Sequence, residues 1–186
     1  GLNPRQNFVL NSGGLNYYVT IKNFHNGEVF LDDECDKIDD AALALINNRS
    51  DLRKGDLLLS SIGRVGDPCI VKSDPINWNI NESVFALRPN KDIITVEFLY
   101  YIFKSDEMQR KLNDSSTGST LTSIKMGHLK ELTINIAPTL EEQTAIATIL
   151  TDMDTEIASL EAKKEKFELI KKGMMQELLT GRVRLV

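Results

Sequence analysis

The chain has 186 residues, a formal net charge of −5 and a hydrophobic fraction of 41 %, enough for one globular domain with its own core. No apolar run approaches the roughly 18 residues that a membrane-spanning helix needs, and no signal peptide opens the chain, so we expect a soluble, cytoplasmic protein that contacts no membrane. Cys35 and Cys69 lie outside any zinc-ligand spacing, which argues against a metal site and a disulfide framework.

The negative charge does not exclude nucleic acid, because it is unevenly distributed. Residues 32–40, DDECDKIDD, hold six acids and one lysine, and the rest of residues 1–138 has a slight positive excess. The acidic segment lacks the ligand spacing of a calcium loop. Asp39 and Asp40 instead suit the first turn of a helix, so we interpret the cluster as a helix-start signal.

In chain order, the first half predicts short strands and one helix. Alternating residues predict a strand over 17–24, and Asn26-Gly27 is a strong hairpin signal before a return strand over 28–31. Apolar residues at helical spacing predict a helix over 38–46. Further strands are expected over residues 57–61, 69–71 and 84–88.

The next segments predict a helix that packs on this sheet. Apolar residues recur at helical spacing through residues 95–112, with Thr95 or Asp92 as a cap. A polar loop follows at residues 114–120. A last strand is expected over residues 132–137.

The last quarter predicts one long amphipathic helix over residues 139–179. Thr139 can cap its first turn, with Glu142 bonding back. At 1.5 Å per residue it spans roughly 60 Å, about twice the width of a small domain, so we expect it to pair with another helix. The eight apolar seam positions, alternating every four and three residues, are Ile146, Leu150, Met153, Ile157, Leu160, Phe167, Met174 and Leu178.

The predicted fold class is therefore α+β. Residues 1–138 form a globular mixed α/β domain, and residues 139–186 form a coiled-coil-forming helical region that serves as spacer and for dimerisation or docking. Lys164 and Lys171 interrupt the seam, and a cation at a core position tends to fix register or partner.

No arrangement of residues predicts a catalytic site. The chain has no GxSxG, HExxH or GxxxxGK[ST] motif, and His25 and His128 are isolated from other candidate groups. An independent enzyme is therefore not expected.

A family resemblance covers nearly the whole chain. The tail that begins LEEQTAIATILTDMDTEIASLEAKKEKFELIKK resembles the helical conserved region of the specificity subunit of type I restriction-modification enzymes. The segments KGDLLLSSIGRVGDPCIV, NINESVFALRP and STGSTLTSIKMGHLKELTINIAP look like that family's target recognition domain. Complete members are similar to two such units in tandem, so the resemblance implies a half subunit or the C-terminal half of a full one.

The resemblance implies DNA recognition without chemistry. The domain would read one half of a bipartite site in double-stranded DNA, and the helix would pair with a second specificity half or a second copy of the chain. It would direct methyltransferase and restriction subunits to that site, and adenosylmethionine, ATP and magnesium would bind only to those partners. The alternative is a protein-interaction module that dimerises through its coiled coil and does not bind DNA.

The candidate DNA-binding residues are those whose side chains pair with phosphates and base edges, at turns and loop ends. Arg64 is expected to read a base, and the hydroxyl-rich loop to contact the backbone. The set is Lys22, Asn23, Arg49, Ser60, Ser61, Arg64, Asn79, Asn81, Ser116, Thr117, Gly118, Ser119, Thr120 and Thr122.

Overall fold

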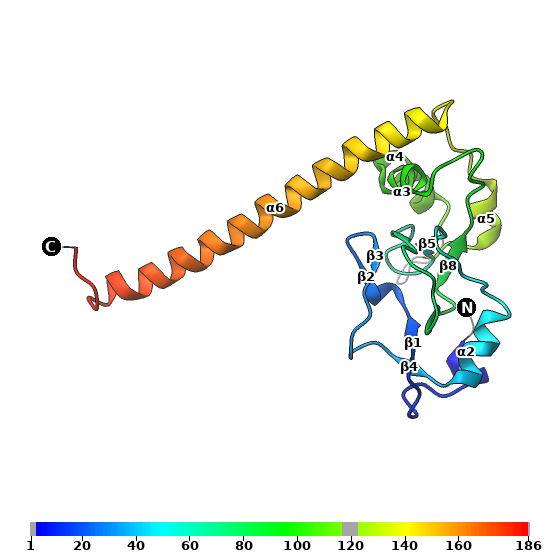
Figure 1. Cartoon of the computed structure of the whole chain (residues 1–186), viewed down its shortest axis with the longest axis horizontal. Helices are drawn as coiled ribbons and strands as arrows, with labels where there is room; N and C mark the ends of the chain where they lie inside the picture. Colours follow the sequence, from blue (N-terminus) through cyan, green and yellow to red (C-terminus); the bar gives the residue numbers. More distant parts are fainter. Residues whose placement is uncertain (1–2, 117–122, 186) are drawn as a thin grey trace. The chain divides into compact units, whose positions relative to one another are not determined.

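The computed structural model describes residues 3–116 and 123–185. The chain divides into two compact units, Gly1–Thr144 and Ala145–Val186. The first holds two small sheets and several short helices, and the second consists mainly of one long helix (Figure 1). The predicted α+β class with a long C-terminal helix is confirmed.

The larger sheet has five strands in the order β2-β3-β6-β5-β8. Strand β5, whose four residues are all buried, lies between β6 and β8 and pairs antiparallel with both, Leu58 opposite Cys69 on one side and Ala86 on the other. An apolar run this short suits a strand covered on both faces. The strands are β2 (Phe24–His25), β3 (Glu28–Val29), β5 (Leu57–Ser60), β6 (Pro68–Ile70) and β8 (Val84–Leu87).

The hairpin prediction is confirmed. Phe24 pairs with Val29 and His25 with Glu28, and the two residues between them, Asn26 and Gly27, have φ of 51° and 77°. Two positive φ values in a two-residue loop are what a type I′ turn requires.

The predicted strand over residues 17–24 is wrong in its middle. Strand β1 (Asn16–Val19) ends early, and a 3-10 turn, η1 (Ile21–Asn23), separates it from β2. Thr20 caps this turn, and the Asn23 side chain bonds back to the Thr20 backbone. This local capping box competes successfully with continued strand pairing.

The smaller sheet has the order β4-β1-β7, formed by β4 (Lys37–Ile38), β1 and β7 (Trp78–Ile80). Helix α2 (Asp40–Asn47) contacts β7, and a short helix α1 (Pro4–Asn7) precedes β1. The Asp39 side chain accepts a bond from the Ala42 amide at 2.7 Å, so the predicted helix-start role of the acids is confirmed for Asp39.

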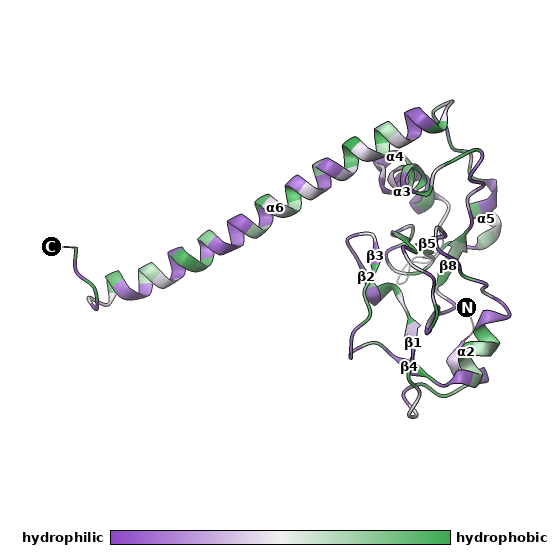
Figure 2. Ribbon diagram, in the orientation of Figure 1, coloured by the Kyte–Doolittle hydropathy of each residue, from purple (hydrophilic) through white to green (hydrophobic). Residues whose placement is uncertain are grey.

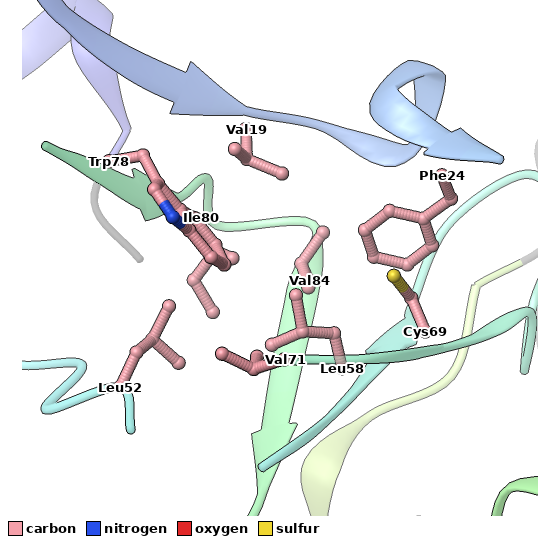
Figure 3. Close-up of a cluster of buried hydrophobic side chains, with 9 residues drawn as sticks. All are labelled: Val19, Phe24, Leu52, Leu58, Cys69, Val71, Trp78, Ile80 and Val84. Carbon is pink, nitrogen blue, oxygen red and sulfur yellow. The ribbon is translucent and has the colours of Figure 1, made fainter. Parts of the chain in front are cut away.

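The main core joins the two sheets. Trp78 and Ile80 from β7 and Val19 from β1 approach side chains from the larger sheet (Figure 3). The cluster contains Val19, Phe24, Leu52, Leu58, Cys69, Val71, Trp78, Ile80 and Val84. Burial of these side chains holds the two sheets together and so positions the turns at the end of β5.

The single helix expected over residues 95–112 is wrong. The chain forms α3 (Val96–Lys104) and α4 (Asp106–Asp114), separated by Ser105, which has the extended φ and ψ of −67° and 145°. The Ser105 hydroxyl accepts from the Met108 amide and starts the second helix.

The strand expected over residues 132–137 is also absent from the described part of the chain. Helix α5 (Met126–Glu131) occupies the preceding segment, and residues 132–137 have no partner strand there. An alternating pattern alone does not supply a neighbouring strand edge.

Helix α6 (Leu140–Leu179) is continuous over 40 residues (Figure 1). Its start is confirmed, since Thr139 Oγ1 accepts from the Glu142 amide at 3.1 Å. No helix among the described residues is long and apolar enough to cross a membrane.

All eight predicted seam residues lie on α6, and hydrophobic segments recur along it (Figure 2). Within the second unit, five of them have exposed fractions between 50 % and 58 %: Met153, Ile157, Leu160, Phe167 and Met174. A stripe of large apolar side chains that is exposed to solvent is typical of a surface that binds a partner.

Candidate nucleic-acid interface

Three turns and one short segment meet at the end of β5. We call them the turn cluster: residues 20–23, 62–66, 81–83 and 123–124. The Ser61 amide donates to Ser83 O at 2.8 Å, and its carbonyl accepts from the Ile124 amide at 2.9 Å. The Arg64 side chain joins residues 20–23 to the same region through the Ile21 carbonyl. Segments that are far apart in sequence therefore form one continuous surface.

Arg64 lies on the 62–66 turn of the turn cluster. Its turn begins and ends with Gly63 and Gly66, whose φ values of 75° and 80° favour glycine. The guanidinium Nη2 donates to the Ile21 carbonyl at 2.9 Å and lies 3.3 Å from the Asp67 carboxylate. The side chain remains 61 % exposed, so it is oriented by the protein and still accessible to a ligand.

Lys22 follows the residue that holds Arg64. Its amide bonds to Thr20 Oγ1, and its side chain is exposed. The structure thus brings together Lys22 and Arg64, which are 42 residues apart in sequence. A long flexible cation beside a planar guanidinium can bind phosphate and a base edge, respectively.

Asn23 requires correction as a contact residue. It is 9 % exposed, and its amide oxygen accepts from the Thr20 backbone at 2.9 Å. Its amide nitrogen donates to Cys35 Sγ, also at 2.9 Å. These bonds use the side chain to shape the turn below Lys22, leaving it a supporting role.

Ser60, Ser61 and Asn79 require the same correction, because each is at most 4 % exposed. The Ser60 and Ser61 hydroxyls donate to the carbonyls of Ile62 and Ser83, at 2.9 and 2.8 Å. Such buried hydroxyl groups hold the turn cluster together and cannot reach a duplex without breaking it.

Asn79 ties the end of α2 to strand β7. Its amide nitrogen donates to Asn47 Oδ1 at 2.7 Å and to the Ser50 carbonyl at 2.8 Å. Arg49 is exposed in that same segment after α2, which is not part of the turn cluster.

Asn81 and Ser116 lie at loop ends. Asn81 is half-buried in the turn cluster, where its Oδ1 accepts from the Ser83 amide at 3.1 Å. Ser116 follows α4, with its hydroxyl donating to Asn113 O at 2.7 Å. The remaining candidates lie outside the described residues: Thr117, Gly118, Ser119, Thr120 and Thr122.

The acids in and beside the turn cluster already have partners. Glu82 accepts from the Tyr18 hydroxyl at 2.9 Å and from Asn3 Nδ2 at 3.1 Å. Burial, together with this bond to Glu82, raises the pKa of Tyr18. Burial also raises the pKa of Asp67, although Arg64 opposes the effect. These contacts reduce the repulsion that a phosphate would meet at the surface.

Sequence reasoning missed these supporting contacts. The Thr20–Asn23 spacing of a capping box was the available signal for η1, whereas the Tyr18–Glu82 pair spans 64 residues and had no local signal.

The described residues contain no group of three or more His, Cys, Asp and Glu side chains placed to hold a metal. Cys35 and Cys69 are free and buried, and burial raises the pKa of both thiols. Thiols held protonated are weak nucleophiles and weak metal ligands.

Comparison with protein families matches residues 3–169 to the type I restriction modification DNA specificity domain. The MjaIX specificity subunit of Methanocaldococcus jannaschii is 39 % identical over 119 residues, covering 64 % of this chain and 26 % of the relative. The EcoBI specificity subunit of Escherichia coli is 35 % identical over 98 residues, covering 53 % and 20 %. The chain thus spans about a quarter of the length of these curated relatives.

Solved structures show a similar fold. The HsdS subunit from Thermoanaerobacter tengcongensis aligns with a TM-score of 0.57 at 16 % identity, covering 92 % of this chain and 44 % of that one. The type I restriction-modification S subunit from M. genitalium aligns with a TM-score of 0.53 at 21 % identity, covering 67 % and 32 %.

Proposed function

Since the chain belongs to the type I restriction-modification DNA specificity family, we propose that its first unit reads one half of a bipartite site in double-stranded DNA. The second unit then connects this DNA-recognising unit to the other subunits of a complex. The chain directs methyltransferase and restriction subunits to the site.

One observation carries this proposal. The fold anchors the exposed Arg64 through a bond to the Ile21 carbonyl, next in sequence to the exposed Lys22. Arginine can donate to both acceptors of guanine, while lysine binds phosphate mainly by charge. The pair therefore suits a contact that combines reading a base with holding the backbone.

The chain contributes recognition and no covalent chemistry to this function. Adenosylmethionine, ATP and magnesium bind to the partner subunits, where methyl transfer and cleavage take place. The purified chain alone transfers no methyl group to DNA.

Helix α6 supplies the connection. Its exposed apolar stripe pairs with a second specificity half or with a second copy of this chain, which holds two reading domains at a fixed separation. The alternative function, an interaction module without DNA binding, uses the same stripe. Family membership and the Lys22–Arg64 surface favour DNA recognition over it.

The test is methylation by the complex reconstituted from this chain, its second specificity half and the methyltransferase subunits. Arg64→Ala is expected to relax base choice at one position, since a bidentate arginine contact is worth about 1–3 kcal/mol of discrimination. Lys22→Ala should weaken binding to all sequences and reduce the salt slope by about one. Sequencing of methylated sites and binding at several salt concentrations measure these effects.

Lys91→Ala is the matched control. Lys91 is exposed and lies beside Gly55, at the end of β5 opposite the turn cluster. It should leave site choice and salt slope unchanged. Wild-type binding that does not depend on salt would favour the interaction module, and Arg64→Ala and Lys22→Ala variants that behave like the control would place the DNA on another surface.

A further inference from the structure

Gln143, in the first turn of α6, is almost completely buried. Only 1 % of it is exposed, whereas the residues on either side of it are exposed. A glutamine in such a position has one acceptor and two donor hydrogens that must be satisfied inside the protein. It is therefore a costly choice for a helix that only needs to pack.

The oxygen and both N–H groups are hydrogen-bonded, and every partner, like Gln143 itself, belongs to the first unit. The amide oxygen accepts from the Thr95 backbone amide at 3.0 Å. The amide nitrogen donates to the Ile93 carbonyl at 3.0 Å and to the Ala137 carbonyl at 2.9 Å. One side chain thus bonds the backbone at the N-cap of α3 and the backbone just before α6.

We propose that Gln143 is a positioning residue that couples the recognition domain to the long helix. The inference rests on the proposed function. Three bonds from one planar amide are satisfied only when the first turn of α6 has one rotation about its axis and one translation along it. An apolar side chain of similar size fills the same space and allows the turn to rotate or slide, because packing is less directional than hydrogen bonding.

Because α6 is one continuous helix, a rotation or slide at its first turn is passed to the turns that follow. In B-DNA, one additional base pair moves a half-site by about 3.4 Å and rotates it by about 35° around the axis. These displacements are small, so a loosely held first turn would tolerate more than one spacing. Gln143 accordingly acts on the choice of spacer length, without touching DNA.

The test uses the reconstituted specificity and methyltransferase complex with three variants. Gln143→Met removes the bonds and preserves the volume. Gln109→Met is the matched control, because Gln109, in α4, also donates to two backbone carbonyls, of Gly66 and Phe103. Gln176→Met changes an exposed glutamine on α6 itself. Affinity is measured for the native spacer, for spacers one base pair longer or shorter, and for a single half-site.

The expected result is specific to Gln143. Gln143→Met should reduce the preference for the native spacer by about fivefold or more, the low end of what a mismatched base pair costs, while half-site affinity changes less than about twofold. Both controls should keep the wild-type preference. Hydrogen exchange should show that the Thr95 amide loses protection only in Gln143→Met.

Failure of the proposed function and failure of this inference alone would give different results. A wild-type complex that binds no site selectively would overturn the proposed function and this inference with it. Unchanged spacer preference in Gln143→Met, with Thr95 protection lost and wild-type discrimination intact, would overturn this inference alone. A loss of spacer preference in Gln109→Met equal to that in Gln143→Met would also overturn it, because general destabilisation would then suffice.

Discussion

Removal of the Arg88 guanidinium tests how the first unit is stabilised. Asp56 precedes β5 and is only 2 % exposed. Arg88 Nε and Nη2 donate to its two carboxylate oxygens at 2.8 and 2.9 Å, and the Arg53 amide donates at 2.9 Å. This geometry is bidentate, which makes the pair stronger than a single-contact ion pair.

Arg88→Ala would leave the buried Asp56 carboxylate with the bond from the Arg53 amide. Breaking a fully buried pair costs about 3–5 kcal/mol. Arg88 itself is 47 % exposed, so water can reach part of the vacated space, and we expect about 2–3 kcal/mol instead. At about 3 °C per kcal/mol for a unit of this size, the melting temperature should fall by about 6–9 °C.

Arg53→Ala is the matched control in the same network. Arg53 pairs with Asp51, and the two side chains are 64 % and 65 % exposed. Such a pair contributes about 0–1 kcal/mol, so the melting temperature should change by no more than about 3 °C. Urea unfolding and thermal melts followed by circular dichroism measure both variants. Equal losses in the two would show that burial of Asp56 does not determine the cost.

Two further predictions concern pH and association. Burial raises the pKa of Asp67, so at neutral pH the ionised carboxylate lowers the stability of the folded protein. Asp67→Asn removes this charge and should raise the melting temperature at pH 7. That gain should vanish below about pH 4, where the wild-type carboxyl is protonated in both states, and a gain independent of pH would contradict the argument. Leu160→Asp should abolish self-association in sedimentation equilibrium, because Leu160 is 53 % exposed on the seam. Ser159→Asp, beside the seam, should leave association intact, and a strictly monomeric wild-type chain would contradict pairing through α6.

Local signals predicted the elements that local chemistry determines. Asn26-Gly27 specified the hairpin because both residues tolerate positive φ, and Thr139 marked the start of α6 through its cap. The heptad pattern predicted the long helix, because a period near 3.5 residues recurs over many turns and few other structures produce it.

Errors arose where a neighbouring element or a cap competed with the pattern. Ser105 divided the expected helix, since its hydroxyl stabilises a new N-terminus. Residues 132–137 alternate as a strand would, but they pair with no strand in the described part of the chain. Periodicity describes which faces are apolar and does not reveal which element lies opposite.

The sequence by itself determined the α+β class, the long helix and the family resemblance, because each depends on residues close together in the chain. Only the tertiary structure separated the candidate contacts into two kinds. Asn23, Ser60, Ser61 and Asn79 are buried and bonded within the domain, whereas Arg64 and Lys22 remain exposed. The physical reason is that a polar side chain has the same hydrogen-bonding capacity in either setting, and burial by distant segments decides whether the protein or a ligand uses it.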